Sequence, residues 1–347
     1  MNLNDGLLDV RDGTFNNGTP SLKIDANDAF GDPILRLRDG ATSVGLTGAV
    51  VVGEAKHGAL EVLSGASLTS GGGVIANQDG SLGFATIAGP GARWDVVGNA
   101  IEIGVGGTAT LNVEGGGQLT SAGGRVAVDL TSITNVLVTG TGSAWISTDV
   151  ISVASGAANP NTISVGIVSV TDGATITATT LQVGDRGSLR GDSTVVADVV
   201  NGGEVDPGSP SGLEVGILTV DGNFAQTADG KLSIDIGGLL PGTQHSQLVV
   251  TEDAMLDGLL DVLLTGGFVP TIGDMFDVLR TPMGTVIGKF ANKPHPVLGK
   301  PFGYKIFYRP RDLPNVVILR VVPEPTILPL AAISGMCVLL RRRGAAV

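Results

Sequence analysis

The sequence Leu111-Asn-Val-Glu-Gly-Gly-Gly-Gln-Leu-Thr-Ser121 is the clearest copy of a pattern that recurs along this chain. Leu111-Asn-Val113 and Leu119-Thr-Ser121 each have a counterpart 51 residues earlier, in Leu60-Glu-Val62 and Leu68-Thr-Ser70. Within each copy, apolar residues alternate with polar or small ones, and a glycine follows. An alternation of period two places one set of side chains on one face of a β-strand. The pattern therefore predicts short strands that end in tight turns.

Two further pairs of segments have the same offset of 51 residues. Val50-Val-Val-Gly53 recurs as Ile101-Glu-Ile-Gly104, and Gly89-Pro-Gly-Ala-Arg-Trp94 recurs as Gly140-Thr-Gly-Ser-Ala-Trp145. A third copy, which includes Val168-Ser-Val170, fits only after a six-residue insertion near 157–162. The body of the chain is therefore a repeat whose third unit is irregular.

Five repeat residues are expected to have structural roles. Gly53, Gly104 and Gly184 should supply the positive φ that ends each short strand. Trp94 and Trp145 could stack on sugar rings, but their fixed place after Gly-x-Gly favours aromatic side chains that plug a turn.

Strands this short cannot each bury enough apolar surface, whereas stacked coils join their inward faces into one core. A unit of 51 residues corresponds to about two coils of roughly 20–25 residues each. We therefore predict an all-β fold, a right-handed parallel β-solenoid (β-helix), over residues 1–200. A β-propeller, with blades of ~40–50 residues, is the alternative.

The residue composition and the spacing of apolar runs change near residue 201. A dense cluster of turn-forming residues, Gly203 to Gly212, is followed by alternating runs such as Leu232-Ser-Ile-Asp-Ile236 and Met275-Phe-Asp-Val-Leu279. Such runs are typical of β-strands. We predict a C-terminal β cap domain over 201–321, antiparallel or solenoid-capping, because the open end of a solenoid core needs cover.

Composition excludes several classes of protein. The chain has 54 glycines among 347 residues without a Gly-X-Y period, so it is not collagen-like. Its net charge of −12 disfavours binding to nucleic acid. The carboxylates could hold Ca²⁺ or simply keep the surface soluble. The only cysteine, Cys337, excludes a disulfide within the chain.

No catalytic, metal-binding or cofactor-binding residues are predicted. His57, His245 and His295 lie far apart in sequence and outside any zinc or triad motif. Carboxylates are scattered at one or two per coil: Glu61, Asp79, Asp95, Glu102, Glu114 and Asp129. Stacking could bring Glu61 and Glu114 into one column, but positions two coils apart are too distant for a catalytic pair at ~5–9 Å. We therefore expect a non-enzymatic protein.

Two other functions remain open. Polysaccharide lyases and hydrolases also use β-helix scaffolds, so such an enzyme is the main alternative. The Thr-x-Thr pattern of Thr175-Ile-Thr-Ala-Thr179 could order water as in an ice-binding solenoid, although one such strand is not an array. This is a remote alternative.

The C-terminus has the features of a membrane signal. Val322-Pro-Glu-Pro325 precedes an apolar run over 326–340, which the cluster Arg341, Arg342 and Arg343 closes. A basic cluster resists crossing the bilayer, and the run is shorter than the ~20 residues of a comfortable span. We predict a short transmembrane helix over 326–340 that anchors the chain transiently. The segment Met1–Gly6 does not look like a secretory signal peptide, so we expect the true start to lie upstream.

The region Val322 to Arg343 resembles the PEP-CTERM protein-sorting signal of Gram-negative and related bacteria. In that family the motif Val322, Pro323, Glu324 and Pro325 would direct an exported protein to an exosortase, a membrane protease. The sorting tail is therefore assigned to 322–347. The repeats resemble β-solenoid repeats of autotransporter passengers and PEP-CTERM surface proteins, best over Ala109–Trp145.

These resemblances imply a protein that is first membrane-anchored and then displayed on the cell surface or released into the extracellular matrix. Its role would be structural or adhesive, with extracellular polysaccharide as the expected contact.

Overall fold

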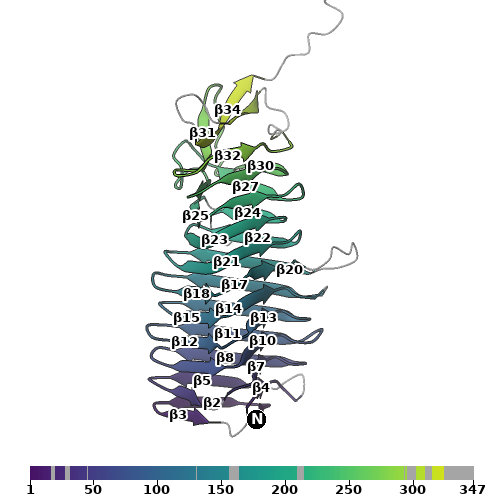
Figure 1. The fold of residues 1–347 in the computed structure, drawn as a ribbon, viewed down its shortest axis with the longest axis vertical. Helices are drawn as coiled ribbons and strands as arrows, with labels where there is room; N and C mark the ends of the chain where they lie inside the picture. The colour runs from purple at the N-terminus through teal and green to yellow at the C-terminus, as the bar shows by residue number, and fades with distance from the viewer. Residues whose placement is uncertain are drawn as a thin grey trace, which may run out of the picture.

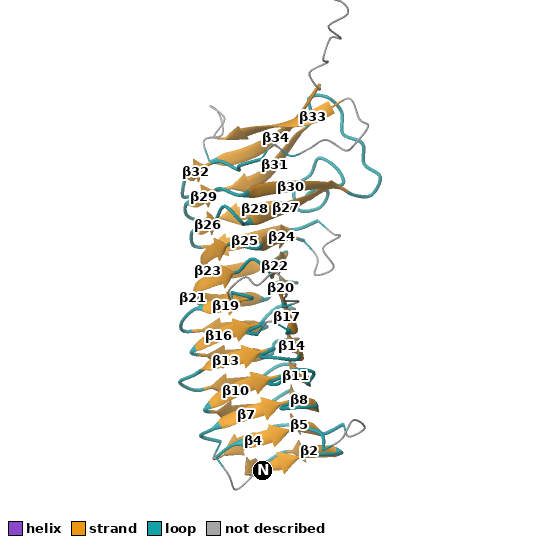
Figure 2. Ribbon diagram, turned by 90° about the vertical axis from the view of Figure 1, so that its right-hand side faces the viewer, coloured by secondary structure: helices purple, strands orange, loops and turns teal. Residues whose placement is uncertain are grey.

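The computed structural model describes residues 1–16, 20–27, 32–44, 46–129, 131–155, 164–208, 215–292, 294, 302–308 and 315–323. All regular secondary structure in these residues is β-strand, without a helix. The strands stack as successive coils into an elongated body, with the N-terminus at one end (Figures 1 and 2). The chain is an all-β parallel solenoid.

One face of the solenoid is an 11-stranded sheet to which successive coils add one strand each. Its strands are β2 (Leu7–Arg11), β5 (Ile34–Arg38), β8 (His57–Leu63), β11 (Leu82–Ala88), β14 (Thr108–Glu114), β17 (Ile133–Thr139), β20 (Val165–Thr171), β22 (Gly187–Gly191), β24 (Glu204–Pro207), β27 (Lys231–Ile236) and β30 (Leu259–Leu264). We call this the first face. Its neighbouring strands are parallel throughout.

The other two faces, together with the antiparallel strands β33 (Phe302–Tyr308) and β34 (Val316–Pro323), form one 23-stranded sheet, because β21 and β23 run across the corner between the faces. The second face contains β3 (Thr14–Asn16), β6 (Thr42–Val44), β9 (Ser67–Ser70), β12 (Arg93–Val96), β15 (Gln118–Ser121), β18 (Ala144–Ser147), β21 (Thr175–Val183), β23 (Thr194–Asn201), β25 (Ile217–Asp221), β28 (Gln247–Val250) and β31 (Met275–Arg280). The third face contains β1 (Asn2–Leu3), β4 (Leu22–Ile24), β7 (Ala49–Val52), β10 (Gly72–Ile75), β13 (Ala100–Ile103), β16 (Gly123–Val126), β19 (Ile151–Val153), the ends of β21 and β23, β26 (Phe224–Gln226), β29 (Ala254–Leu256) and β32 (Val286–Gly288).

The register confirms that one unit of the sequence repeat is two coils. On the first face Leu60 pairs with Ala85 of the next coil, and Ala85 pairs with Leu111 of the coil after that. Parallel ladders of this kind also exclude the propeller, whose blades are built from antiparallel strands. Alternation along the strands places Leu60 and Val62 in the core, at 1% and 0% exposure, as the sequence pattern predicts.

An exchange of large and small core residues explains why the period is two coils and not one. Trp94 pairs with Leu68 before it and with Leu119 after it, and Leu119 pairs with Trp145. The column therefore alternates between leucine and tryptophan. Both indoles are fully buried, so they lie in strands of the core and neither plug a turn nor face solvent, where a sugar ring could stack on them.

A glycine in the preceding coil makes room for each indole. A Cβ at Gly73 would lie 3.0 Å from Trp94 Cζ2, and a Cβ at Gly124 would overlap the Trp145 ring. In the coil between, the position of Gly73 and Gly124 is filled by Ile101. Each indole nitrogen donates a hydrogen bond of 3.0 Å to a buried serine of the previous coil, Ser70 or Ser121. In one coil of the repeating unit a tryptophan therefore packs on a glycine of the preceding coil, and in the next coil a leucine packs on an isoleucine.

The repeat glycines stand at one corner of the solenoid. Gly53 and Gly104 have φ of +71° and +69°, which is the left-handed conformation that the sequence pattern predicts. Gly184 does not have positive φ; a Cβ there would lie 2.3 Å from the Ala154 carbonyl oxygen. Gly184 is therefore needed for close approach to the previous coil and not for its backbone conformation.

Replacing Gly53 by alanine is expected to lower the free energy of unfolding by about 2–3 kcal/mol. The left-handed conformation alone costs an alanine about 1–2 kcal/mol, and the new Cβ would also lie 2.4 Å from the backbone oxygen of Leu82. Gly80→Ala is the matched control, because Gly80 has φ +75° with nothing within 4 Å of its Cβ position. Urea denaturation of both variants measures the difference, and equal losses would contradict the contribution of the close contact.

The parallel pairing does not stop at residue 200, where the sequence suggests a separate domain. Strands β24, β27 and β30 extend the first face, and pairs β28–β31 and β29–β32 extend the other two. Among the strands that the structure describes, antiparallel ladders begin where β34 (Val316–Pro323) pairs with β31 and with β33 (Phe302–Tyr308). One hydrophobic cluster extends from Phe15 to Val321, so the core is continuous across the expected boundary.

Part of the predicted sorting tail lies outside the described residues. Val322 and Pro323 end strand β34, whereas Glu324, Pro325, the segment 326–340 and Arg341–Arg343 belong to the undescribed part. Among the described residues, no helix is long and apolar enough to cross a membrane. The insertion near 157–162 also falls in a part that the structure does not describe.

Candidate functional site

Four successive strands of the first face, β22, β24, β27 and β30, bring charged side chains together on the side of the sheet that faces away from the core. Leu189, Val205 and Leu232 of these strands are stacked in register and fully buried in the core. Because side chains alternate along a strand, their neighbours point outward. These neighbours, with Asp235 and Asp261 further along the face, form what we call the charged cluster: Arg190, Glu204, Asp206, Lys231, Asp235 and Asp261.

Glu204 is at the centre of the charged cluster. Its carboxylate lies 2.7 Å from Lys231 Nζ and 3.4 Å from the guanidinium of Arg190, and it accepts a 2.8 Å hydrogen bond from Ser233 Oγ. Burial alone would raise the pKa of Glu204, but the hydrogen bonds from Lys231 and Ser233 and the two positive charges lower it below its ordinary value. Glu204 is therefore ionised in the folded protein at neutral pH.

Asp206 and Asp235 have the opposite electrostatic environment. Each residue is 5% exposed. Burial raises the pKa of Asp206 to about 6, and Arg190, at 3.8 Å, only partly offsets this. Burial, together with the charges of Asp261 and Glu204, also raises the pKa of Asp235 to about 6. Oδ2 of Asp235 is buried and has no hydrogen-bond partner in the described part of the chain. The cluster thus places carboxyl groups of high pKa near a carboxylate of low pKa.

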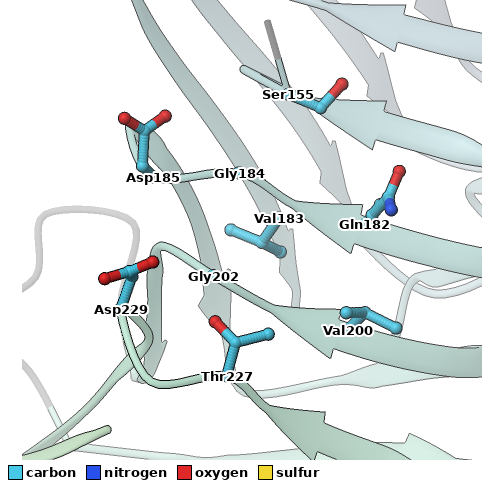
Figure 3. A pocket seen from close by; sticks show the side chains of 9 residues that line it. All are labelled: Ser155, Gln182, Val183, Gly184, Asp185, Val200, Gly202, Thr227 and Asp229. Carbon is cyan, nitrogen blue, oxygen red and sulfur yellow. The ribbon is translucent and has the colours of Figure 1, made fainter. Parts of the chain in front are cut away.

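A groove of about 630 Å³ lies at the corner that leads into these same strands. We call it the corner groove; it is lined by Ser155, Gln182, Val183, Gly184, Asp185, Val200, Gly202, Thr227 and Asp229. Figure 3 shows Asp185 and Asp229 on turns on the two sides of Gly202, while Gln182 and Val200 come from strands. Gly202 and Asp229 each stand two residues before a member of the charged cluster, Glu204 or Lys231.

A second groove, of about 540 Å³, lies on the second face. Arg93 Nε is 2.6 Å from both carboxylate oxygens of Asp95, and Thr120 Oγ1 is 2.5 Å from Asp95 Oδ1. Val97 and Ile146, which also line this groove, are 60% and 37% exposed. Polar groups beside exposed aliphatic side chains suit a ligand that is polar at its edges and apolar on its faces, such as a sugar ring.

The second face does not carry a regular array of threonines. Thr175, Thr194 and Thr219 follow one another in a column. Earlier in the same column stand Arg93, Gln118 and Ala144, and the column beside Thr175 continues from Thr177 to Val196 and Asp221. Ordering of ice needs a flat repeated surface, so this face gives the ice-binding alternative little support.

The structure separates most of the charged residues that the sequence singled out. Glu61 stacks with Thr86 and Asn112, whereas Glu114 stacks with Ala88, so the two glutamates are not in one column. Glu61 pairs with Arg36, Asp95 with Arg93 and Glu102 with Arg125. These carboxylates are therefore occupied by ion pairs on separate coils.

The histidines do not form a site among the described residues. His245 is 1% exposed, and its two ring nitrogens face the carbonyl oxygens of Gly238 and Asp277, each at 3.3 Å. His57 lies 3.5 Å from Asp32, and His295 is outside the described residues. In the part of the chain that the structure describes, no group of three or more histidine, cysteine or acidic side chains is arranged to hold a metal ion.

The charged cluster was missed by reasoning on the sequence because its residues fall on both sides of the predicted domain boundary. The signal was nevertheless present in Leu189-Arg190, Glu204-Val-Asp206 and Lys231-Leu-Ser-Ile-Asp235. In each of these short strands the charges alternate with apolar residues. Aligning the three strands would have placed the charges on one outer face.

Neither a scan against protein-family models nor a search of the curated proteins found a match for this chain. Its function is therefore inferred from its own residues.

Proposed function

We propose that this chain is an exported bacterial protein whose solenoid acts as a stiff rod at the cell surface or in the extracellular matrix. Its role is structural or adhesive, and its outer faces contact extracellular polysaccharide. The observation that carries the proposal is the single core that continues from the first coils to the last strand. Coils that share one core cannot bend independently, because each is packed on both neighbours.

The C-terminal sequence supports the surface location. Val322 and Pro323 end the last strand, and the sorting motif continues with Glu324 and Pro325. In this proposal an exosortase-type protease is the partner of the tail, and the segment 326–340 with Arg341–Arg343 holds the chain in the membrane until processing. The antiparallel strands β33 and β34 would act as the C-terminal cap. The hand of the solenoid would be right-handed, as for other parallel crossovers.

The corner groove suits the hydroxyl groups of a neutral sugar. Its lining offers the carboxylates of Asp185 and Asp229, the amide of Gln182 and the hydroxyl of Thr227. Carboxylates and amides form strong directional hydrogen bonds with hydroxyl groups. Val183 and Val200 add apolar surface beside them. An open groove with these groups can hold part of a chain without enclosing its end, which is how a rod would bind a long polymer.

Replacing Asp185 and Asp229 together by alanine is expected to weaken binding to a neutral polysaccharide by about tenfold or more. Hydrogen bonds to charged groups contribute about 1.5–3 kcal/mol, and about 1.4 kcal/mol corresponds to a factor of ten. Electrophoresis of the native protein through gels that contain a panel of polysaccharides measures this as lost retardation. Asp79→Asn changes another exposed carboxylate and should leave the retardation intact. Retardation that is equal in all variants would count against the corner groove.

Polysaccharide hydrolysis at the charged cluster is the second candidate function. Glycoside hydrolases pair a carboxyl group of raised pKa with an ionised carboxylate, and the opposite pKa shifts of Glu204 and of Asp206 and Asp235 favour this reading specifically. The same polysaccharide panel separates the two functions. A structural rod releases no reducing ends or unsaturated products. Release that disappears in Asp206→Asn or Asp235→Asn would establish the enzyme instead.

A further inference from the structure

The last coils contain a pocket of about 460 Å³ that differs in character from the grooves described above. It lies between the segment 289–292, which follows β32, and the strand β33. Its lining includes Lys289, Phe290, Asn292, Tyr304, Lys305 and Tyr308. The volume falls in the range of pockets that hold small ligands, about 300–1,000 Å³. We call it the lysine pocket.

Two lysines, Lys289 and Lys305, border the lysine pocket. Lys289 Nζ lies 5.9 Å from the centre of the Tyr308 ring, which lines the pocket, and Lys305 Nζ lies 5.1 Å from the centre of the Phe307 ring, which does not. Within the part of the chain that the structure describes, neither lysine forms an ion pair with a carboxylate. The chain as a whole has a net charge of −12. Two lysines without a carboxylate partner beside one pocket favour an anionic ligand.

The lysine pocket also contains a hydrogen-bond donor that lacks an acceptor. Tyr304 is 7% exposed, and its buried hydroxyl has no hydrogen-bond partner among the residues that the structure describes. Burial raises the pKa of Tyr304 to about 12, so the phenol keeps its proton at neutral pH. A buried polar group without a partner costs about 1–3 kcal/mol. A ligand that brings an acceptor to this hydroxyl recovers that energy.

The walls of the lysine pocket are held in place by hydrogen bonds. Phe290 N–H donates to the hydroxyl of Tyr308 at 3.1 Å. Asn292 accepts a hydrogen bond from the backbone N–H of Leu260 and donates one to its carbonyl oxygen, each at 2.9 Å. The rings of Phe290 and Tyr308 lie 6.3 Å apart. The pocket is therefore organised before a ligand arrives, which reduces the entropy lost on binding.

We infer that the lysine pocket binds the carboxylate-bearing sugar of an acidic polysaccharide. Lys289 and Lys305 face the carboxylate, the Tyr304 hydroxyl donates a hydrogen bond to it, and the aromatic side chains of Phe290 and Tyr308 contact the sugar ring. This inference rests on the proposed contact with polysaccharide and adds a second site with a charge preference. A uronic acid combines a carboxylate with a ring that has an apolar face, so it matches both parts of the pocket.

Isothermal titration of the full chain with trigalacturonate and with its methyl ester tests this inference. The ester keeps the sugar rings and removes the charge, so it is expected to bind at least about tenfold more weakly. Lys289→Gln with Lys305→Gln should weaken trigalacturonate binding by about tenfold or more, and Tyr304→Phe should weaken it severalfold. Lys56→Gln, at an exposed lysine outside the pocket, should change nothing. Thermal melting of each variant verifies that it is folded.

Three results would overturn the inference. They are equal affinity for the acid and its ester, trigalacturonate affinity that is unchanged in the double lysine variant, and binding to anionic lipid vesicles without binding to trigalacturonate. None of these affects the retardation by neutral polysaccharide at the corner groove, so the proposed function would survive them. Conversely, loss of all retardation by neutral polysaccharide with intact trigalacturonate binding would remove the corner groove and leave the lysine pocket.

Discussion

Replacing Trp145 by alanine is expected to lower the free energy of unfolding by about 3–5 kcal/mol. The indole is fully buried, packs over Gly124 of the preceding coil and donates a 3.0 Å hydrogen bond to Ser121. Its removal leaves a cavity in the middle of a continuous core, where coils on both sides limit how far the structure can collapse. The variant also leaves the buried hydroxyl of Ser121 without this donor. Urea denaturation monitored by circular dichroism measures the loss.

The neighbouring residues supply both a control and a sharper test. Ile146 lies next in the strand but faces outward at 37% exposure, so Ile146→Ala should cost much less. Gly124→Ile should be strongly destabilising on its own, because even a Cβ overlaps the Trp145 ring. The double variant Trp145→Leu with Gly124→Ile recreates the leucine–isoleucine pair of Leu119 and Ile101. It should be more stable than the sum of the two single changes predicts. Additive losses would contradict the pairing of tryptophan with glycine.

Replacing Asp206 or Asp235 by asparagine is expected to raise the free energy of unfolding at pH 7.5 by about 1–3 kcal/mol for each residue. The pKa of each carboxyl rises from 3.8 to about 6 on folding, and each pKa unit corresponds to about 1.4 kcal/mol. The size of each pKa shift sets the upper figure of about 3 kcal/mol for that residue. Screening by solvent on this side of the sheet reduces the figure. Asparagine keeps the shape of the protonated acid and cannot ionise.

The sign of the pH dependence follows from the same shifts. Below about pH 4 the two carboxyls are protonated in both folded and unfolded chains, so they do not oppose folding. Between about pH 4 and pH 6 the unfolded chain loses these protons first, so the contribution of the two carboxyls to the stability of the unmodified protein falls as pH rises. Above pH 6 the loss is complete. The advantage of the asparagine variants should therefore be near zero at pH 3.5 and full at pH 7.5.

Differences between variants isolate these two carboxyls from other titrating groups. Burial lowers the pKa of His245, so this histidine removes stability as pH falls below about 6.5. Its effect is common to the unmodified protein and the variants and cancels in the comparison. Asp79→Asn, at an exposed carboxylate, should leave the whole pH profile unchanged. Asparagine variants that are less stable at pH 7.5 than at pH 3.5, relative to the unmodified protein, would show that Arg190 stabilises ionised Asp206 after all.

The solenoid and the two-coil repeat were predictable because their signals are local. The alternation in Leu60-Glu-Val62 and Leu111-Asn-Val113 is visible within three residues. The need for glycine at positions 53 and 104 follows from the left-handed backbone conformation of a single turn. The role of Gly184 was not predictable in the same way. It depends on the Ala154 carbonyl of the previous coil, and no property of the residues adjacent to Gly184 indicates that contact.

The expected boundary near residue 200 illustrates a second limit. Leu189 pairs with Val205 across a short coil, and Val205 pairs with Leu232 across a much longer one. Earlier coils, such as those that join Leu60 to Ala85 and Ala85 to Leu111, are nearly equal in length. When coil length varies, the fixed offset disappears from the sequence although the ladders continue. The changed residue pattern after Asn201 therefore predicts a new domain, and the regular repeats alone do not place Glu204, Asp206 and Asp235 on one face.

The amino-acid sequence alone determined that the body is β-structured, repetitive and acidic, because period and composition are properties of residues close together in the chain. The resemblance of the tail to a sorting signal stays a prediction from its terminal motif. The charged cluster and the lysine pocket depend instead on which strands lie side by side. Arg190, Glu204 and Lys231 meet because three coils of unequal length stack in register. Lys289 and Lys305 line one pocket because β33 lies beside the segment after β32. Which strands stack on one another depends on core contacts between residues far apart in the sequence. This stacking brings these charges together.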